Sequence, residues 1–174
     1  MQEQKQVSVF GPSSIEKNGW IDMEAITLGK LLADNGYIQC NGGYTGVMES
    51  AAKGGFEAGG KVRGVLISTF SNEGNQYLTE KEKKDVWERN KDLMKGPTPR
   101  ILFSPRESVG TIWELASATA KSLFLGPPII MIVQDGDKVF EAIRYLWGEK
   151  NIKNIVVVNS AEAAVARLCE FTAG

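Results

Sequence analysis

The chain alternates short, almost wholly apolar runs with longer amphipathic stretches, and this alternation restricts its fold more than any other feature. Apolar residues fill nearly every position of the short runs, as in parallel strands that are covered on both faces. The longer stretches carry apolar residues at helical spacing. The predicted strands are 6–10, 37–40, 62–68, 100–104, 129–133 and 154–159, and the predicted helices are 22–35, with Asp22 as N-cap, 45–58, 80–95, 109–124, 137–149 and 160–171.

This order of elements predicts an α/β fold, a three-layer α/β/α Rossmann-like domain with a doubly wound, mainly parallel sheet. A length of 174 residues suffices for one compact core, so we expect residues 1–174 to form a single domain. Ligands of such sheets bind at the carboxyl ends of the strands. The turns that follow the strands are therefore the places to look for a site, and the irregular stretch 68–80 is a candidate flap beside it.

Composition excludes several classes of function. Lysine and arginine (20) nearly balance aspartate and glutamate (21), so we expect no nucleic-acid partner and no membrane partner. The chain shows no run of 18 apolar residues and no secretory leader, which predicts a soluble, cytoplasmic protein. The absence of histidine removes the Ser-His-Asp triad and histidine-based zinc sites. Cys40 and Cys169 lack metal-ligand spacing and are expected to be free thiols, and no metal or cofactor is expected.

A glycine-rich turn follows the second predicted strand. Residues 42–60 read GGYTGVMESAAKGGFEAGG, and a helix begins near Val47. A strand, a glycine turn and a helix start in this order direct backbone N–H groups and the helix dipole at an anion. Such a turn also needs glycine when no ligand is present, because its φ angles are positive. We interpret it as a phosphate- or nucleotide-binding turn, and the later glycines at 54, 55, 59 and 60 as helix-packing and helix-end residues.

Two other turns end strands at the same expected edge of the sheet. Residues 11–14, GPSS, follow the first strand, where their hydroxyls either bind a ligand or cap the turn. Residues 104–111 follow the fourth strand, and Gly110 and Thr111 would present N–H groups and a hydroxyl at a helix N-terminus. Glu114 lies one turn inside that helix, where it either interacts with the helix dipole or takes part in chemistry. The charge-rich segment 80–95 reads as a solvated helix face, in which nothing marks Arg89 as special.

Taken together, these segments resemble the LOG (Lonely Guy) family and its wider superfamily, often labelled lysine decarboxylase-like. The superfamily is related to DprA-like and molybdenum-cofactor-carrier proteins. The resemblance extends over nearly the whole chain, and its most specific part is the GG-x-x-G-x-M stretch with the glycines that follow it. It implies a single LOG-like nucleotide-binding domain. The segments that carry it are VFGPSS, NGGYTGVMESAAKGGFEAGGKVRGVL, WERNKDLM and VGTIWELASA.

The resemblance also implies roles for individual residues. In the family, a P-G-G-x-G-T-x-x-E turn holds a nucleotide phosphate, and its final glutamate acts together with an arginine on the preceding helix. These positions correspond to Glu114 and Arg89, which are the implied catalytic residues. The residues expected to bind phosphate or nucleotide are Gly11, Ser13, Gly42, Gly43, Thr45, Gly46, Ser108, Gly110 and Thr111.

The chain departs from the family at one loop. Where the family has two glycines after the proline, this chain reads Pro105-Arg106-Glu107-Ser108-Val109, which is one residue longer. Without those glycines, side chains should obstruct or reshape the phosphate cradle. Glu107 would bring negative charge toward a phosphate, and Arg106 would offset it. We therefore expect weak turnover of plain AMP, or none.

The activity implied by the resemblance is hydrolysis of the N-glycosidic bond of AMP or N6-modified AMP, which yields the free base and ribose 5-phosphate. The alternative is a non-catalytic protein of the same fold that binds a nucleotide or carries a phosphorylated pterin such as the molybdenum cofactor. Lysine decarboxylation is not expected, because no segment presents a pyridoxal phosphate site with a Schiff-base lysine.

The resemblance further implies a homodimer that pairs through helices flanking the site. The apolar segment 113–124, WELASATAKSLF, is a fitting surface, although it could instead be buried inside the monomer. We expect sedimentation at micromolar concentration to show a dimer. A single species of about the chain mass, 19.0 kDa, would contradict this expectation.

Overall fold

The computed structural model describes residues 5–97, 99–124 and 126–173. Within them, seven strands form one sheet in the order β4-β3-β2-β1-β5-β6-β7, and every neighbouring pair is parallel. The strands are β1 (Gln6–Phe10), β2 (Ile38–Asn41), β3 (Val62–Ile67), β4 (Glu80–Lys84), β5 (Arg100–Phe103), β6 (Ile129–Ile132) and β7 (Ile155–Val158). The helices are α1 (Trp20–Asp34), α2 (Val47–Glu57), α3 (Val86–Leu93), α4 (Val109–Phe124), α5 (Val139–Trp147), α6 (Glu149–Ile152) and α7 (Ala161–Thr172).

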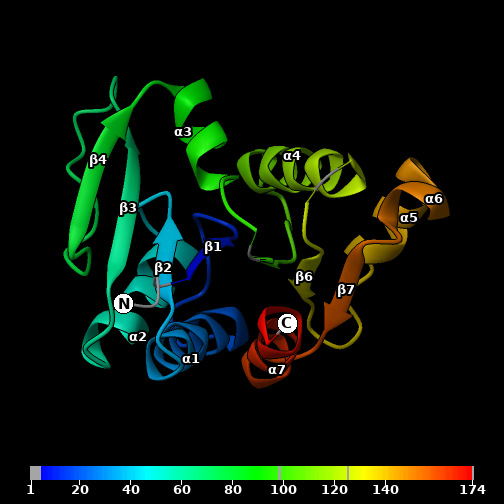
Figure 1. The fold of residues 1–174 in the computed structure, drawn as a ribbon, viewed down its shortest axis with the longest axis horizontal. Coiled ribbons are helices and arrows are strands. Elements are labelled where there is room, and N and C mark those ends of the chain that lie inside the picture. Colours follow the sequence, from blue (N-terminus) through cyan, green and yellow to red (C-terminus); the bar gives the residue numbers. More distant parts are fainter. Residues whose placement is uncertain (1–4, 98, 125, 174) are drawn as a thin grey trace.

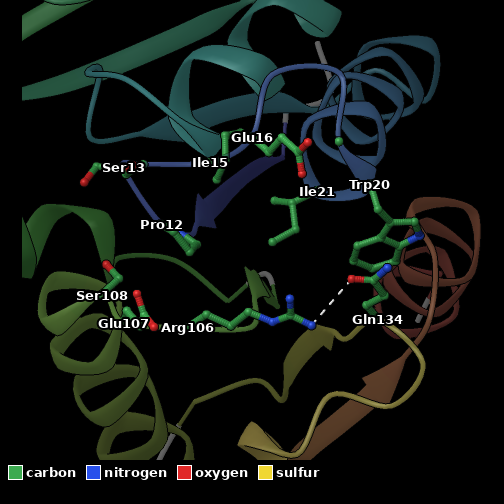
Figure 2. Close-up of a pocket in the computed structure, with 12 residues that line it drawn as sticks. Pro12, Ser13, Ile15, Glu16, Trp20, Ile21, Arg106, Glu107, Ser108 and Gln134 are labelled. Carbon is green, nitrogen blue, oxygen red and sulfur yellow. Dashed lines mark hydrogen bonds between the residues drawn. The ribbon is translucent and has the colours of Figure 1, made fainter.

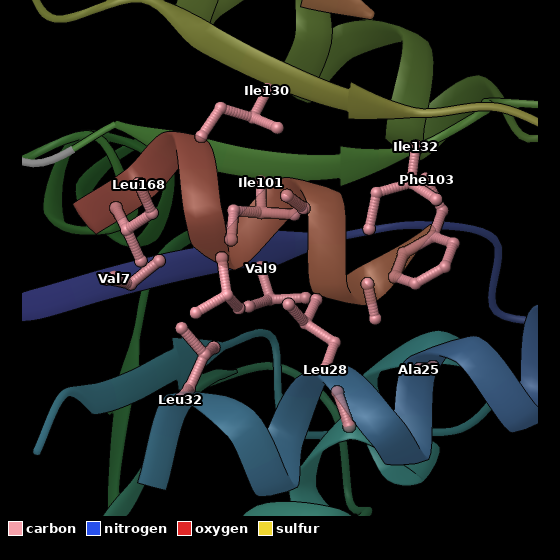
Figure 3. Close-up of a cluster of buried hydrophobic side chains, with 14 of the residues drawn as sticks. Val7, Val9, Ala25, Leu28, Leu32, Ile101, Phe103, Ile130, Ile132 and Leu168 are labelled. Atoms are coloured by element: carbon pink, nitrogen blue, oxygen red, sulfur yellow. The ribbon is translucent and has the colours of Figure 1, made fainter. Parts of the chain in front are cut away.

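Helices cover both faces of the sheet, as predicted for a doubly wound α/β fold. Helices α1, α2 and α7 pack on one face, and α3 to α6 pack on the other (Figure 1). Successive residues of a strand serve opposite cores, since Ile101 and Phe103 belong to the first core and Leu102 to the second. In the first core, strand side chains meet Leu28 and Leu32 of α1 (Figure 3). Burial on both faces explains why these strands are apolar at nearly every position.

The strand order reverses direction at β1, whose neighbours are β2 and β5. The chain moves outward from β1 to β2, β3 and β4, and then returns to the other side of β1 with β5. At such a switch point the connections after the two central strands run to opposite faces and leave a crevice at the carboxyl edge. The turns after β1 and β5 therefore border the position at which a ligand is expected.

Two helices on the first face pack backbone against backbone. A Cβ atom placed on Gly29 of α1 would lie 1.9 Å from the Ala51 carbonyl oxygen, and one on Gly54 of α2 would lie 1.9 Å from the Ile26 carbonyl oxygen. Glycine is therefore required at both positions for this approach. Gly59, with φ of 76°, follows the end of α2 in the left-handed region. The packing and helix-end roles predicted for the later glycines agree with this geometry.

The predicted helix 80–95 is wrong in its first part. Residues 80–84, EKEKK, form the edge strand β4, which pairs only with β3 among the described strands, and the helix covers Val86–Leu93. Glutamate and lysine favour helices, but the backbone pairing with β3 overrides this local preference. A charged edge strand also resists pairing with other chains. Asp85 follows the strand and caps α3 by accepting hydrogen bonds from the N–H groups of Trp87 and Glu88.

Two smaller predictions also need correction. Asp22 is not the N-cap of the first helix, because α1 begins at Trp20 and its cap is Gly19. The Asp22 carboxylate instead accepts hydrogen bonds from the Asn18 N–H group at 2.7 Å and the Ser50 hydroxyl at 2.5 Å. The predicted helix 137–149 is divided into α5 and α6 by Gly148, whose φ of 76° cannot continue a helix.

The close packing of α1 and α2 yields a prediction. Gly54→Ala should lower the free energy of unfolding by about 1–3 kcal/mol, because the added methyl group meets a backbone carbonyl that cannot rotate away. Urea denaturation measures the change. Lys53→Ala, on the same helix, is the matched control and should change stability by about 0.5 kcal/mol or less. Equal stability of Gly54→Ala and the parent chain would contradict the close packing.

Candidate functional site

A cavity of about 560 Å³ opens at the carboxyl edge of the sheet, beside the switch point. Its walls come from the turns after β1 and β2, the loop after β3, α3, and the β5–α4 loop with the first turns of α4. The structure thus brings together segments that are far apart in the sequence. Eight of the predicted site residues line this cavity: Gly11, Ser13, Thr45, Arg89, Ser108, Gly110, Thr111 and Glu114.

Arg89 and Glu114 form a buried pair in the cavity wall. Nη1 of Arg89 lies 3.8 Å from Oε1 of Glu114, and the two side chains are only 7% and 11% exposed. Nε of Arg89 donates a hydrogen bond of 2.8 Å to the Val65 carbonyl of β3. The guanidinium is therefore anchored to the sheet at one end and directed toward Glu114 at the other.

Burial changes the acidity of Glu114. Desolvation raises the pKa of its carboxyl group to about 7, and the nearby positive charge of Arg89 opposes this shift only in part. Both the protonated and the ionised form are therefore populated near neutral pH. A carboxyl group with this property can both accept and donate a proton, which suits general acid–base catalysis.

The glycine turn after β2 makes room for Arg89. A Cβ atom on Gly42 would lie 2.0 Å from Nη2 of Arg89, so any other residue here would displace the guanidinium from this position. Gly43 and Gly46 have φ angles of 78° and 68°, and a Cβ atom on Gly46 would lie 2.3 Å from the Pro12 carbonyl oxygen. None of these three glycines lines the cavity of Arg89 and Glu114.

Two backbone donors at this turn are occupied by the protein itself. The Gly43 N–H donates to Oδ1 of Asn41 at 2.7 Å, and the Val47 N–H donates to the Pro12 carbonyl at 3.0 Å. The Thr45 hydroxyl donates to the Ser13 carbonyl at 2.9 Å. The bonds to Pro12 and Ser13 tie the turn after β2 to the turn after β1. The geometry gives the turn a structural role in shaping the cavity, in addition to the binding role predicted for it.

The N-terminus of α4 forms another wall. Oγ of Ser108 accepts a hydrogen bond from the Thr111 N–H at 3.3 Å and lies 2.8 Å from the Thr111 hydroxyl oxygen. Ser108 thus caps the helix in the manner of an N-cap serine. A Cβ atom on Gly110 would have no neighbour within 4 Å, so the backbone there is open to a ligand. Thr111 itself is buried.

The β5–α4 loop, whose sequence differs from the family motif, takes a conformation that places Arg106 outside this cavity. Nε of Arg106 donates to Oδ2 of Asp137 at 2.8 Å, and the Asp137 side chain is only 3% exposed. Arg106 does not line the cavity, whereas Glu107 does. The expectation that Arg106 offsets the charge of Glu107 in the cradle is therefore not met. Glu107 has φ of 51°, a left-handed conformation that is uncommon for residues other than glycine.

The loop after β3 lies beside the site, where the sequence predicted a flap. Phe70 and Asn72 line the cavity, and the Phe70 ring lies 5.7 Å from that of Tyr44. Asn75 anchors the loop, since its side-chain amide donates to the carbonyls of Gly43 and Tyr44 at 3.1 and 2.9 Å. Sequence reasoning assigned no role in the site to the apolar lining residues, although Met48 ends the GG-x-x-G-x-M stretch. They are Met48, Ile67, Val86, Val109 and Trp113, together with the aromatic Tyr44.

Several other sequence features have structural outcomes. Cys40 and Cys169 are free, as predicted, and burial raises the pKa of the Cys40 thiol to about 11. In the described ranges, no group of three or more Cys, Asp or Glu side chains is placed to hold a metal ion. None of the described helices is long and apolar enough to cross a membrane. On α4, Val109, Ile112 and Phe124 are exposed, whereas the face with Leu115 and Ala118 is buried inside the monomer.

Comparisons with known proteins agree with the resemblance inferred from the sequence. The molybdenum cofactor binding protein from the phototrophic bacterium Rippkaea orientalis is 22% identical and has a TM-score of 0.80, with 98% of each chain covered. The molybdenum cofactor carrier protein of Chlamydomonas reinhardtii is 23% identical and has a TM-score of 0.77, with 98% of this chain and 100% of that chain covered. An uncharacterized protein of Archaeoglobus fulgidus is 28% identical over 139 residues, which are 78% of this chain and 87% of that protein.

Because their sequence identities are low, the two solved structures establish the shared fold alone. The resemblance to the LOG superfamily predicted from the sequence is confirmed by a family model, and the chain shares the fold of the two molybdenum cofactor proteins. The family model of the SLOG cluster4 family matches residues 4–165, which is most of the chain. The chain therefore belongs to the SLOG cluster4 family.

Proposed function

We propose that the cavity binds a nucleoside 5′-monophosphate, AMP or an N6-modified AMP, and that the protein hydrolyses its N-glycosidic bond. The observation that carries this proposal is the pair of Arg89 and Glu114, buried together in the wall of an open cavity. A carboxyl group with a pKa of about 7 serves acid–base chemistry better than it serves stability. Nothing in simple ligand storage requires such a group.

The reaction can be written with these residues. Water attacks C1′ of the ribose, the C1′–N bond breaks, and positive charge of oxocarbenium character develops on the sugar. The Glu114 carboxylate stabilises that charge and takes a proton from the attacking water, and the same proton then neutralises the departing base. Arg89 holds a ribose hydroxyl or the phosphate. The products are the free base and ribose 5-phosphate, and no other reactant is needed.

A second function is favoured by a specific observation. Glu107 stands at the cavity where the family of phosphoribohydrolases has glycine, and its carboxylate opposes a phosphate dianion in that cradle. Two structures that share the fold over nearly the whole chain are described as molybdenum cofactor binding and carrier proteins. The second candidate is therefore a non-catalytic carrier of a phosphorylated pterin or a nucleotide.

One assay separates the two functions. Incubation with AMP and with an N6-substituted AMP, followed by chromatography of the free base, should show slow release by the parent chain. Glu114→Gln should lower the rate by about 10²–10⁴ while ligand binding survives, because only the proton-transferring group is lost. Arg89→Ala should weaken both binding and turnover. Glu88→Gln and Lys91→Ala, which alter exposed residues of α3, are the matched controls.

The outcomes discriminate clearly. Tight binding without any release of base would reject the hydrolase and support the carrier. Equal turnover by the parent chain and by Glu114→Gln would show that the chemistry does not depend on Glu114.

The pKa of Glu114 yields a prediction on stability. A pKa raised in the folded state means that the native protein holds this proton while the unfolded chain has released it. The stabilising contribution of Glu114 to the free energy of unfolding is therefore complete below pH 4.5 and is lost as pH rises toward 7. The parent chain should lose stability relative to Glu114→Gln across this window, by at most about 1.4 kcal/mol per pH unit. Urea denaturation from pH 4.5 to 8 measures the difference, and a constant difference would show that Glu114 titrates normally.

A further inference from the structure

A second cavity, of about 510 Å³, borders the turn after β1 (Figure 2). Trp20 and Ile21, from the first turn of α1, line it together with Ile15 of the preceding loop. Arg106 of the β5–α4 loop and Gln134, which follows β6, also line it. The cavity therefore crosses the carboxyl ends of β1, β5 and β6 at the switch point of the sheet.

The charges around this cavity do not suit a phosphate. Arg106 is its one lining cation among the described residues, and its guanidinium is already paired with the buried carboxylate of Asp137 at 2.8 Å. The same guanidinium contacts the Gln134 amide oxygen at 3.5 Å (Figure 2). Glu16 and Glu107 add two carboxylates to the lining. A group that binds here must therefore be uncharged or a hydrogen-bond donor.

The remaining lining suits a flat heterocycle. The Trp20 ring offers an aromatic surface for stacking, and the Ile15 and Ile21 side chains add apolar surface. Glu16 offers only hydrogen-bond acceptors, and Gln134 offers a donor and an acceptor. An aminopurine or a pterin has both the flat ring system and the N–H groups that such a lining can bind.

The two cavities are adjacent. Ser13, Glu107 and Ser108 line both of them, so the two cavities share part of their walls. A ligand with a polar phosphorylated sugar and a flat base has two chemically distinct ends. Both cavities have aromatic side chains in their walls. The first adds Arg89 and the open N-terminus of α4, which suit a phosphorylated sugar, and the second adds the Glu16 carboxylate beside Trp20, which suits a base with N–H groups.

We propose that the Trp20 cavity holds the heterocyclic base of the ligand, with Trp20 stacking on the ring and Glu16 accepting its N–H groups. The sugar phosphate then lies in the Arg89–Glu114 cavity, a placement that rests on the function proposed above. Trp20 and Glu16 become the residues that determine which base is bound. The ligand class is a phosphorylated riboside, or a phosphorylated analogue, of an amino-bearing bicyclic heterocycle.

Calorimetric titration tests this assignment without turnover when the chains carry Glu114→Gln. Trp20→Leu should weaken AMP binding roughly 5- to 150-fold, the range found for loss of base–aromatic stacking, and should leave ribose 5-phosphate binding unchanged. Trp147→Leu is the matched control, because Trp147 is also a half-buried tryptophan packed against a core and lines neither cavity. It should change neither affinity.

Glu16 is tested with a second ligand pair. The parent chain should bind AMP more tightly than purine riboside 5′-monophosphate, which lacks the amino group, and Glu16→Ala should abolish that preference. Glu16 is exposed on a loop, so its substitution should not affect folding. A preference that survives in Glu16→Ala would reject its role as acceptor.

The outcomes distinguish this inference from the proposed function. Trp20-dependent binding without any release of base in the parent chain would support the base site and reject the hydrolase. Equal loss of AMP and ribose 5-phosphate binding in Trp20→Leu, or no loss of either, would overturn the base site even if base is released. If AMP does not bind, the same variants are titrated with 6-hydroxymethylpterin phosphate, and failure of both ligands to bind overturns both proposals.

Discussion

The burial of Arg89 beside Glu114 is the interaction on which the rest of the site depends. Removing two charged groups from water costs several kcal/mol for each ion, and a separation of 3.8 Å recovers only part of that cost. The protein offsets it with the hydrogen bond from Arg89 to the Val65 carbonyl and with partial protonation of Glu114. Replacement of a buried ion pair by hydrophobic residues of similar volume is often neutral or stabilising. The pair is therefore better explained by the chemistry it allows than by a contribution to folding.

The position of Arg89 depends in turn on how α3 is held. Asp92, one helical turn after Arg89, accepts hydrogen bonds from Arg63 of β3 at 2.6 Å and from Lys84 of β4 at 2.7 Å. Burial alone would raise the pKa of Asp92, but these cations and Lys95 hold it well below its usual range. The charged edge strand β4 therefore has two roles. It resists pairing with other chains, and its Lys84 holds α3, the helix that carries Arg89, through Asp92.

Some of these elements could be predicted from the sequence, and others depend on contacts that only the folded chain makes. The strands buried on both faces were predictable, since their apolar runs reflect that burial directly. Strand β4 was not predictable, because EKEKK has no apolar face and only its pairing with β3 makes it a strand. The cavity was predicted through the rule that turns after strands share one edge. The role of Gly42 in admitting Arg89 was not, because the contact joins two segments about 50 residues apart and only the folded chain reveals it.

The β5–α4 loop, which is one residue longer than in the family motif, lines both cavities and distinguishes this site from that motif. Its conformation commits Arg106 to Asp137, so the positive charge of the loop lies beside the Trp20 cavity and outside the Arg89–Glu114 cavity. Glu107, held in a left-handed conformation, lies between the two spaces and lines both. In the proposed placement of the ligand, the phosphate avoids Glu107 and approaches the open backbone at Gly110, while a base with N–H groups gains from the same carboxylate. The Glu107 carboxylate of the β5–α4 loop therefore disfavours a phosphate beside it and favours the N–H groups of the base in the proposed ligand placement.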